Sequence, residues 1–340
     1  MTDPSNADDV AAALRAWAQR TYGGTTTLAD GPHPITGGLD TFIYRFRLEG
    51  HVEGHAAGPL ILRLYPNGLR GPSAQREAEI LRFLTTAGYP APHPLEASPA
   101  MDDFGVPYVV MEQVPGRTVL DRVASKPQQA PALVDALAAA HARLHQIDPA
   151  GWPFEVHPET WEVDRRLADA EAAGPPPDEA LAKALRWLQD NRAMAQGEGP
   201  SVCHYDFHPM NALVDDAGRV AVIDWEGAGV GDRHSDLART LVLFEWAPVV
   251  AGSRAERVAL RAAKPWLVKR YRKAYARHLP VEDDRLRYWM ALHAADSWAE
   301  SAQLLAGTFE RNTRTETREG PAAVVGPAMA KLFHRLVPEA

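Results

Sequence analysis

Two histidines, an asparagine and several aspartates lie close together in the segment HYDFHPMNALVDDAGRVAVID, residues 204–224. The DDAG sequence favours a tight turn, and the Leu- and Val-rich residues on either side favour two short strands. Such a hairpin brings Asn211 and Asp224 to the same end, with Asp206 beside them. Oxygen ligands of this kind suit Mg²⁺, which prefers carboxylates and phosphate oxygens to imidazoles. The segment therefore predicts a Mg²⁺ site held by Asn211 and Asp224.

The spacing of these residues also predicts a reaction. His204, Asp206 and Asn211 follow the pattern H-x-D-x-x-x-x-N, which in kinases precedes a hairpin and a second metal-binding aspartate. The aspartate of that pattern orients or deprotonates the attacking hydroxyl. We therefore expect Asp206 to be the catalytic residue of a phosphoryl transfer and His204 to hold the loop through hydrogen bonds. His208 is expected to be a packed or solvated imidazole.

Composition limits the partners and the compartment. The chain has 340 residues, 46% of them hydrophobic, and a net charge of −8 without a long basic run. A nucleic-acid partner and an anionic membrane surface are therefore not expected. The single cysteine suits a reducing compartment, and neither a signal sequence nor a long apolar run is recognisable. We expect a cytoplasmic protein, either a monomer or a homodimer.

The first third of the chain predicts a small β-rich lobe. Apolar residues alternate in 41–50 and in 59–66, which favours two antiparallel strands. Helical spacing predicts one helix over 6–24 and another over 73–88. A further β-rich run, VPYVVMEQVPG, stops at a Pro-Gly pair that marks a lobe boundary.

The remainder of the chain predicts a larger, mainly helical lobe in which the hairpin is embedded. Helical patterns follow one another over residues 132–148, 179–195, 254–279 and 285–307. We therefore predict an α+β fold with an N-terminal nucleotide-binding lobe at 1–113. The C-terminal lobe, 114–340, would carry catalysis and substrate binding.

The hairpin segment resembles the aminoglycoside phosphotransferase and choline kinase family, which are protein-kinase-like kinases of small molecules. The resemblance extends over further segments in the same order, from about residue 30 to about residue 245, as ITGGLDTFIYRFRL, LILRLYP, QREAEILRFL, YVVMEQVPG and GDRHSDLART. It implies a protein-kinase-like bilobal fold, ATP with Mg²⁺ as cofactors, and GTP as an open alternative. The acceptor would be a hydroxyl of a small molecule such as an aminoglycoside, another antibiotic or an amino-alcohol.

The resemblance assigns five residues to the nucleotide. Gly37 and Gly38 lie in a segment similar to the family's phosphate-binding loop, where glycine lets the backbone approach phosphates. Arg63 stands where lysine is the commoner cation, and Glu77 on the following helix would orient it. Glu112 lies in a segment similar to the hinge that cradles adenine.

Three more positions correspond to characteristic positions of the same family. Asp236 corresponds to an aspartate that is usually structural in the family. Tyr205 and Met210 occupy positions that are often glycine, so their side chains would either narrow the substrate mouth or simply pack.

The last hundred residues contain no recognisable motif that indicates which substrate is bound. Trp289, His293, Asp296 and Glu300 follow helical spacing of four, three and four residues and would form one stripe. The stripe is either the polar edge of a core helix or a substrate wall, in which carboxylates attract ammonium groups and tryptophan stacks on a cation or sugar.

Two other functions are open on the sequence. In a metal-dependent hydrolase, His204, Asp206 and His208 would bind zinc or iron, and Asn211 and Asp224 would have no role. The other is a non-catalytic nucleotide-binding protein with a kinase fold. The complete set of Asp206, Asn211 and Asp224 argues against it.

Overall fold

The structure, a computed structural model, describes residues 2–23, 25–35, 41–50, 58–66, 71–157, 161–172, 179–197, 199–246, 254–307 and 319–339. The chain divides into two compact units. Unit 1 comprises Met1–Gly116 and Ala221–Glu226, and unit 2 comprises Arg117–Val220 and Gly227–Ala340. The chain therefore leaves unit 1 at Gly116, near the expected boundary at residue 113. It returns to unit 1 for six residues after the hairpin turn, which a linear division of the sequence does not anticipate.

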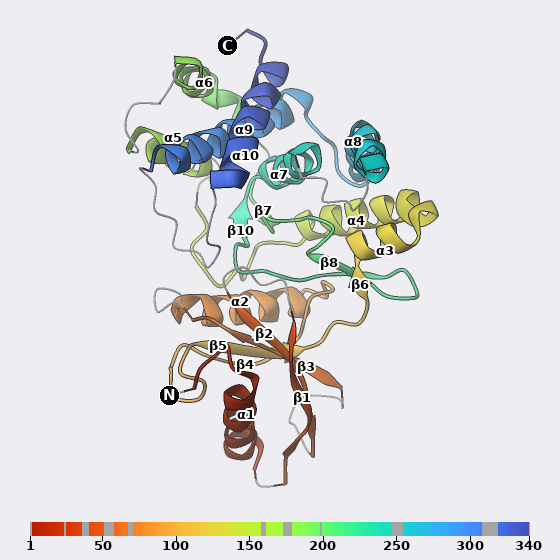
Figure 1. Cartoon of the computed structure of the whole chain (residues 1–340). Coiled ribbons are helices and arrows are strands. Elements are labelled where there is room, and N and C mark those ends of the chain that lie inside the picture. Colours follow the sequence, from red (N-terminus) through yellow and green to blue (C-terminus); the bar gives the residue numbers. More distant parts are fainter. Residues whose placement is uncertain are drawn as a thin grey trace. The chain divides into compact units, whose positions relative to one another are not determined.

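Unit 1 is built on a five-stranded antiparallel sheet with the strand order β1-β2-β3-β5-β4. Figure 1 shows helices α1 and α2 on opposite sides of this sheet. The elements are α1 (Ala7–Tyr22), β1 (Thr27–Ile35), β2 (Phe42–Glu49), β3 (Pro59–Leu64), α2 (Gly71–Thr86), β4 (Pro94–Ser98) and β5 (Tyr108–Glu112).

Helix α1 begins and ends where its sequence predicts. The side chain of Asn6 accepts hydrogen bonds from two backbone N–H groups of the first turn, and Gly23 ends the helix. Val10, Leu14 and Trp17 repeat on one face and are fully buried. This apolar face fastens α1 to the sheet.

The two faces of the sheet contact different helices: one packs against α1 and the other against α2. Leu60, Leu62 and Leu64 alternate along β3 and are fully buried in the core that α1 completes. Because successive side chains point to opposite faces of a strand, Arg63 lies on the other face. Its contact with Glu77 of α2 shows that α2 covers that face.

Unit 2 is mainly helical and contains two small sheets. Strand β7 pairs antiparallel with β10, and the other sheet has the strand order β6-β8-β9. Of strand β9, only the first residue, Val220, belongs to unit 2. Figure 1 shows α7 next to α9 and α10. The elements are β6 (Arg117–Thr118), α3 (Val119–Ser125), a 3₁₀ turn (Pro127–Gln129), α4 (Ala130–His145), α5 (Trp161–Ala172), α6 (Glu179–Asp190), a 3₁₀ turn (Arg192–Ala195), β7 (Ser201–Cys203), β8 (Ala212–Val214), β9 (Val220–Val222), β10 (Gly229–Gly231), α7 (Arg233–Trp246), α8 (Arg254–Tyr275), α9 (Asp283–Ala306) and α10 (Glu319–Leu336).

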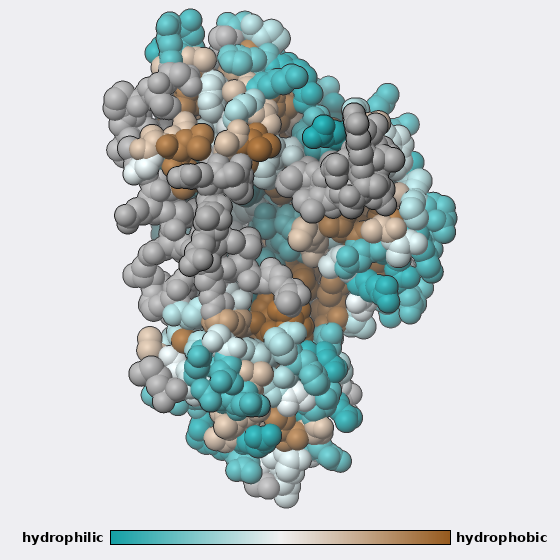
Figure 2. Space-filling view, viewed as in Figure 1, coloured by the Kyte–Doolittle hydropathy of each residue, from teal (hydrophilic) through white to brown (hydrophobic). Residues whose placement is uncertain are grey.

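The surface is mixed in character. On the face shown in Figure 2, hydrophilic residues are interspersed with small brown groups of hydrophobic ones. Within the part of the chain that the structure describes, every helix is too short or too polar to cross a membrane.

Candidate active site

The predicted hairpin is present between β8 and β9. Asp215 closes its turn, because the carboxylate accepts hydrogen bonds from the backbone N–H groups of Ala217 and Arg219, each at 2.9 Å. Gly218 adopts a left-handed φ of 80°, which glycine allows without steric cost. The turn residues therefore fix the hairpin that follows the loop 204–211.

Asp206 and Asn211 lie together, as the sequence predicts. The Asn211 side-chain amide donates to the backbone oxygen and to a carboxylate oxygen of Asp206, both at 3.0 Å. These two bonds connect the ends of the loop. Since the amide nitrogen is used in this way, Oδ1 is the Asn211 atom that is left to bind a cation.

An imidazole and a guanidinium lie beside the Asp206 carboxylate. His208 Nε2 lies 3.3 Å from one carboxylate oxygen, and Arg239 Nη2 lies 3.9 Å from the other. Burial alone would raise the pKa of Asp206. The hydrogen bond from His208 and the charge of Arg239 outweigh burial and lower the pKa. Asp206 is therefore an ionised carboxylate at neutral pH, and 44% of its side chain is exposed.

His204 supports the loop from within. Its side chain is fully buried, and Nδ1 accepts a hydrogen bond from the backbone N–H of Asp206 at 3.2 Å. The structural role expected for His204 fits this bond. Among the described residues, His204, Asp206 and His208 do not form a three-ligand metal cluster, so the zinc or iron centre of the alternative hydrolase lacks its ligand geometry.

Helix α7 holds the same loop from outside. Asp236 accepts hydrogen bonds from the backbone N–H groups of His204, at 2.6 Å, and Tyr205, at 2.9 Å. One turn later, the Thr240 hydroxyl donates to the backbone oxygen of Phe207 at 2.8 Å. The sequence resemblance identifies Asp236 as structural, but no local pattern in the sequence predicts that α7 bonds to His204, Tyr205 and Phe207 of the loop.

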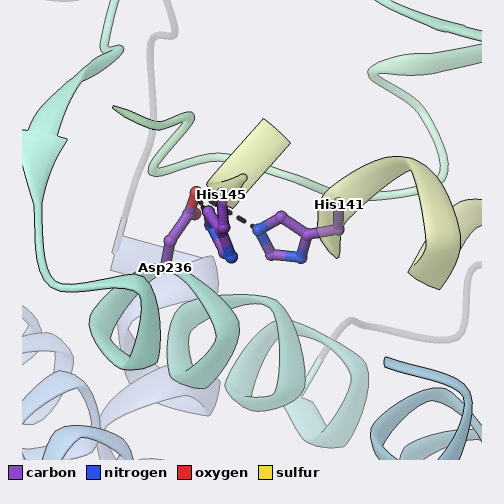
Figure 3. Close-up of side chains that lie close together, drawn as sticks. All are labelled: His141, His145 and Asp236. Carbon is purple, nitrogen blue, oxygen red and sulfur yellow. Dashed lines mark hydrogen bonds and ion pairs between the residues drawn. The ribbon is translucent and has the colours of Figure 1, made fainter. Parts of the chain in front are cut away.

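Asp236 also faces two histidines of α4 (Figure 3). His141 Nε2 and His145 Nε2 each lie 3.2 Å from its Oδ2, and each Nδ1 contacts a tyrosine hydroxyl of α8, that of Tyr271 or Tyr275. Burial and the neighbouring His141 lower the pKa of His145 to about 4. Burial would raise the pKa of Asp236, but the two imidazoles, His141 first, hold it well below its usual range.

This buried cluster has the ligand types of a metal site. Both oxygens of Asp236 already accept backbone N–H groups of the loop 204–211, so a metal would have to compete with those bonds. We therefore interpret Asp236 as a buried support of the loop that is hydrogen-bonded to His145 and lies close to His141. The two histidines are one helical turn apart, which is the signal by which the pair can be found in the sequence.

Asp236→Asn is expected to lower the free energy of unfolding by about 1–3 kcal/mol, because the new amide group turns an N–H donor toward a backbone N–H donor. Urea unfolding measures this change. The control is Asp169→Asn, whose surface pair with Arg165 spans 2.7 Å, and a change below about 1 kcal/mol is expected there. Equal stability of the two variants would contradict the support role of Asp236.

Asp224 lies in unit 1, beside Arg63. Arg63 Nη1 donates to Glu77 Oε1 at 2.9 Å and lies 2.8 Å from Asp224 Oδ1, and Nη2 lies 3.5 Å from a Glu226 oxygen. The ion pair of Arg63 with Glu77 is therefore present as predicted. Tyr65 also donates to the second oxygen of Glu77. Burial raises the pKa of Glu77, and Arg63 opposes that effect.

The segment around Asp224 is anchored within unit 1. Trp225 is fully buried and packs edge-on against Tyr89, and the backbone N–H of Val222 donates to Pro90 at 2.9 Å. Asp224 adopts a left-handed φ of 68°. The convergence of Asp224 with Asp206 and Asn211 stays a prediction.

Fewer contacts are available for the other residues that are predicted to bind the nucleotide. Gly37 and Gly38 lie outside the described residues. The backbone N–H of Glu112 donates to His93 at 2.9 Å, at the end of β5 where the hinge is expected. Nucleotide binding by Gly37, Gly38, Arg63, Glu77 and Glu112 stays a prediction.

Trp289 does not share a surface stripe with the two acidic residues. It is fully buried, and its indole N–H donates to Asp232 at 2.7 Å. The expectation that Trp289 forms a substrate wall is therefore wrong, because this face of α9 packs in the core. Asp296 forms an ion pair with Arg166 and keeps 42% of its side chain exposed, and Glu300 is half-buried. Their role toward a substrate stays a prediction.

Comparison with known proteins adds the evolutionary context. Residues 44–258 match the phosphotransferase enzyme family. Over 288 residues the chain is 24% identical to acyl-CoA dehydrogenase family member 10 of Mus musculus, covering 78% of this chain and 26% of that protein. Over 142 residues it is 25% identical to an aminoglycoside 3'-phosphotransferase of Escherichia coli, covering 38% of this chain and 50% of that enzyme. The chain thus spans about a quarter of the first relative and half of the second.

A solved structure shows the same fold. A thermostable mutant of aminoglycoside phosphotransferase APH(4)-Ia, in ternary complex with AMP-PNP and hygromycin B, superimposes with a TM-score of 0.64. The two sequences are 19% identical, and the match covers 96% of this chain and all of the other. The likeness confirms the predicted α+β, protein-kinase-like fold.

Proposed function

The chain belongs to the phosphotransferase enzyme family, and on that premise we propose that it transfers the γ-phosphoryl group of ATP to a hydroxyl of a small molecule. The observation that carries the proposal is the bonded pair of Asp206 and Asn211 in a loop held by α7. Kinases place these two residue types at this spacing to orient the attacking hydroxyl and to bind a metal.

Asp206 suits the orienting role. It is ionised, partly exposed and fixed by Asn211 and His208. A carboxylate of lowered pKa is a weak base, so Asp206 would align the acceptor hydroxyl and receive its proton late, when the bond to phosphorus is largely formed. Positioning therefore carries more of the rate acceleration than proton abstraction.

The donor atoms fit Mg²⁺. Asn211 offers Oδ1, and Asp224 keeps its second carboxylate oxygen while Oδ1 faces Arg63. Amide and carboxylate oxygens suit a hard cation, and two such residues leave positions for phosphate oxygens and water. When bound, Mg²⁺ neutralises charge that develops on the transferred phosphoryl group. Arg63 would bind an ATP phosphate through Nη2, because Nη1 is already occupied by Glu77 and Asp224.

For the acceptor, we infer two classes from different observations. The acidic side chains of Asp296 and Glu300 and the net charge of −8 favour an amine-bearing alcohol such as an aminoglycoside or amino-alcohol. The likeness to acyl-CoA dehydrogenase family member 10 favours a hydroxylated acyl compound. The two classes differ in charge, so an acceptor panel separates them.

The test is Mg²⁺-dependent ADP release from ATP across aminoglycosides, macrolides, choline-like amines, sugars and hydroxyacyl-CoA compounds. We expect at least one acceptor whose turnover disappears in Asp206→Ala and on chelation of the metal. ATP binding without any acceptor turnover would favour the non-catalytic alternative. Absence of ATP binding would overturn the proposal.

A further inference from the structure

Tyr205 has an unusual backbone conformation directly before Asp206. Its φ of 61° lies in the left-handed region, which is unfavourable for a residue with a side chain. This cost explains why glycine is common at this position in the family that the sequence resembles. The chain must therefore hold Tyr205 in place by other contacts.

Both backbone groups of Tyr205 are fixed by α7. Its N–H donates to Asp236 at 2.9 Å, and its carbonyl oxygen accepts the Nε–H of Arg239 at 2.7 Å. Asp236 and Arg239 are three residues apart on the same helix, so one helix face grips the peptide groups on both sides of the residue. This arrangement fixes the direction in which the chain enters Asp206.

The side chain of Tyr205 lies against β10, where two glycines make room for it. A Cβ atom on Gly231 would lie 2.1 Å from the Tyr205 hydroxyl oxygen, and one on Gly229 would lie 3.3 Å from ring carbon Cε2. The hydroxyl also hydrogen-bonds Cys203 of the neighbouring strand β7, and burial keeps its pKa well above the usual value. We call Gly229 and Gly231 the tyrosine socket.

We propose that Tyr205, seated in the tyrosine socket, is a positioning residue for Asp206. The inference rests on the proposed function, in which Asp206 orients the acceptor hydroxyl. Packing of the Tyr205 ring in the socket compensates for the strained backbone. The loop can therefore adopt, with a tyrosine, the conformation that a glycine would adopt without strain. Gly231 acts on Asp206 only through Tyr205.

A double-mutant cycle tests the inference. Gly231→Ala is expected to lower kcat by about 10- to 100-fold, because a small misplacement of a reacting group costs that much. The KM for ATP should stay within about twofold, since its binding residues are not moved. In a Tyr205→Gly background, the same alanine is expected to change kcat by less than about twofold, because no ring is left to displace.

Two variants make the result specific. Tyr205→Phe removes the hydroxyl that the new Cβ would meet, so it should restore part of the kcat lost in Gly231→Ala. Gly227→Ala is the matched control, because a Cβ there has only an ordinary 3.9 Å contact with the His204 oxygen. If Gly231→Ala lowers kcat equally in the wild-type and Tyr205→Gly backgrounds, the proposal is overturned.

Hydrogen exchange of the loop 204–211 provides a second readout that needs no acceptor. Gly231→Ala should speed exchange in the peptide that contains the Tyr205 N–H, and Gly227→Ala should not. Unchanged exchange in Gly231→Ala would overturn the inference. If wild-type protein phosphorylates no acceptor, the proposed function fails, whereas this exchange comparison still decides whether the socket positions the loop.

Discussion

Asp206→Asn is expected to lower kcat by about 10²–10⁴, the usual range for loss of a general base. The amide keeps the size of the carboxylate, and its oxygen can still accept the bond from Asn211, which spans 3.0 Å. The variant therefore removes the negative charge and the proton acceptor with little change in shape. Steady-state kinetics with the acceptor found in the panel measure the loss.

Nucleotide binding should be nearly unaffected by this substitution. ATP affinity is expected to stay within about twofold of wild type, because Asp206 acts on the acceptor. The matched control is Asp216→Asn in the hairpin turn, where the side chain is 98% exposed and pairs with Arg122. Its turnover should equal that of wild type. Wild-type turnover in Asp206→Asn would remove Asp206 from the catalytic role.

The strands of unit 1 differ in how well local residues predict them. Leu60, Leu62 and Leu64 alternate in β3 and are all buried, so the pattern and the structure agree. The residue pattern alone does not predict β1, because TLADGPHPI contains Gly31, Pro32 and Pro34, which favour turns. β1 lies at the edge of the sheet, where one row of N–H groups needs no partner and proline is tolerated.

In the candidate site, contacts between residues close in sequence can be predicted, whereas contacts between residues far apart in sequence cannot. The pairing of Asp206 with Asn211 follows from their spacing within one loop. The bonds from Asp236 to that loop join residues about thirty positions apart, and no local pattern announces them. The same holds for Trp289, since its burial depends on the packing of α9 against Asp232.

Arg63→Met is expected to lower the free energy of unfolding by about 3–5 kcal/mol, because removing one partner of a buried ion pair leaves the other charge uncompensated. The side chain of Glu77 is only 2% exposed and depends on Arg63 at 2.9 Å. Asp224 and Glu226 lose the same cation. Urea unfolding followed by tryptophan fluorescence measures the change.

Three further variants separate the charge effect from loss of the side chain. Arg63→Met combined with Glu77→Gln should be more stable than Arg63→Met alone, since the buried unpaired carboxylate is gone. Arg63→Lys keeps the charge and should lose less stability than Arg63→Met, but it cannot reproduce the fork that reaches several carboxylates. Arg45→Met, which breaks a half-exposed pair with Asp30 in the same sheet, should cost less than about 1 kcal/mol.

ATP affinity distinguishes a purely structural Arg63 from one that also binds phosphate. Loss of a charged hydrogen bond to phosphate corresponds to about 1.5–3 kcal/mol, or roughly 10- to 100-fold weaker binding. We expect that loss in Arg63→Met and a smaller one in Arg63→Lys, measured by calorimetry where both proteins are folded. If folded Arg63→Met binds ATP as tightly as wild type does, Arg63 has only a structural role in the ion pair with Glu77. A residue that binds phosphate directly cannot be removed without lowering the affinity for ATP.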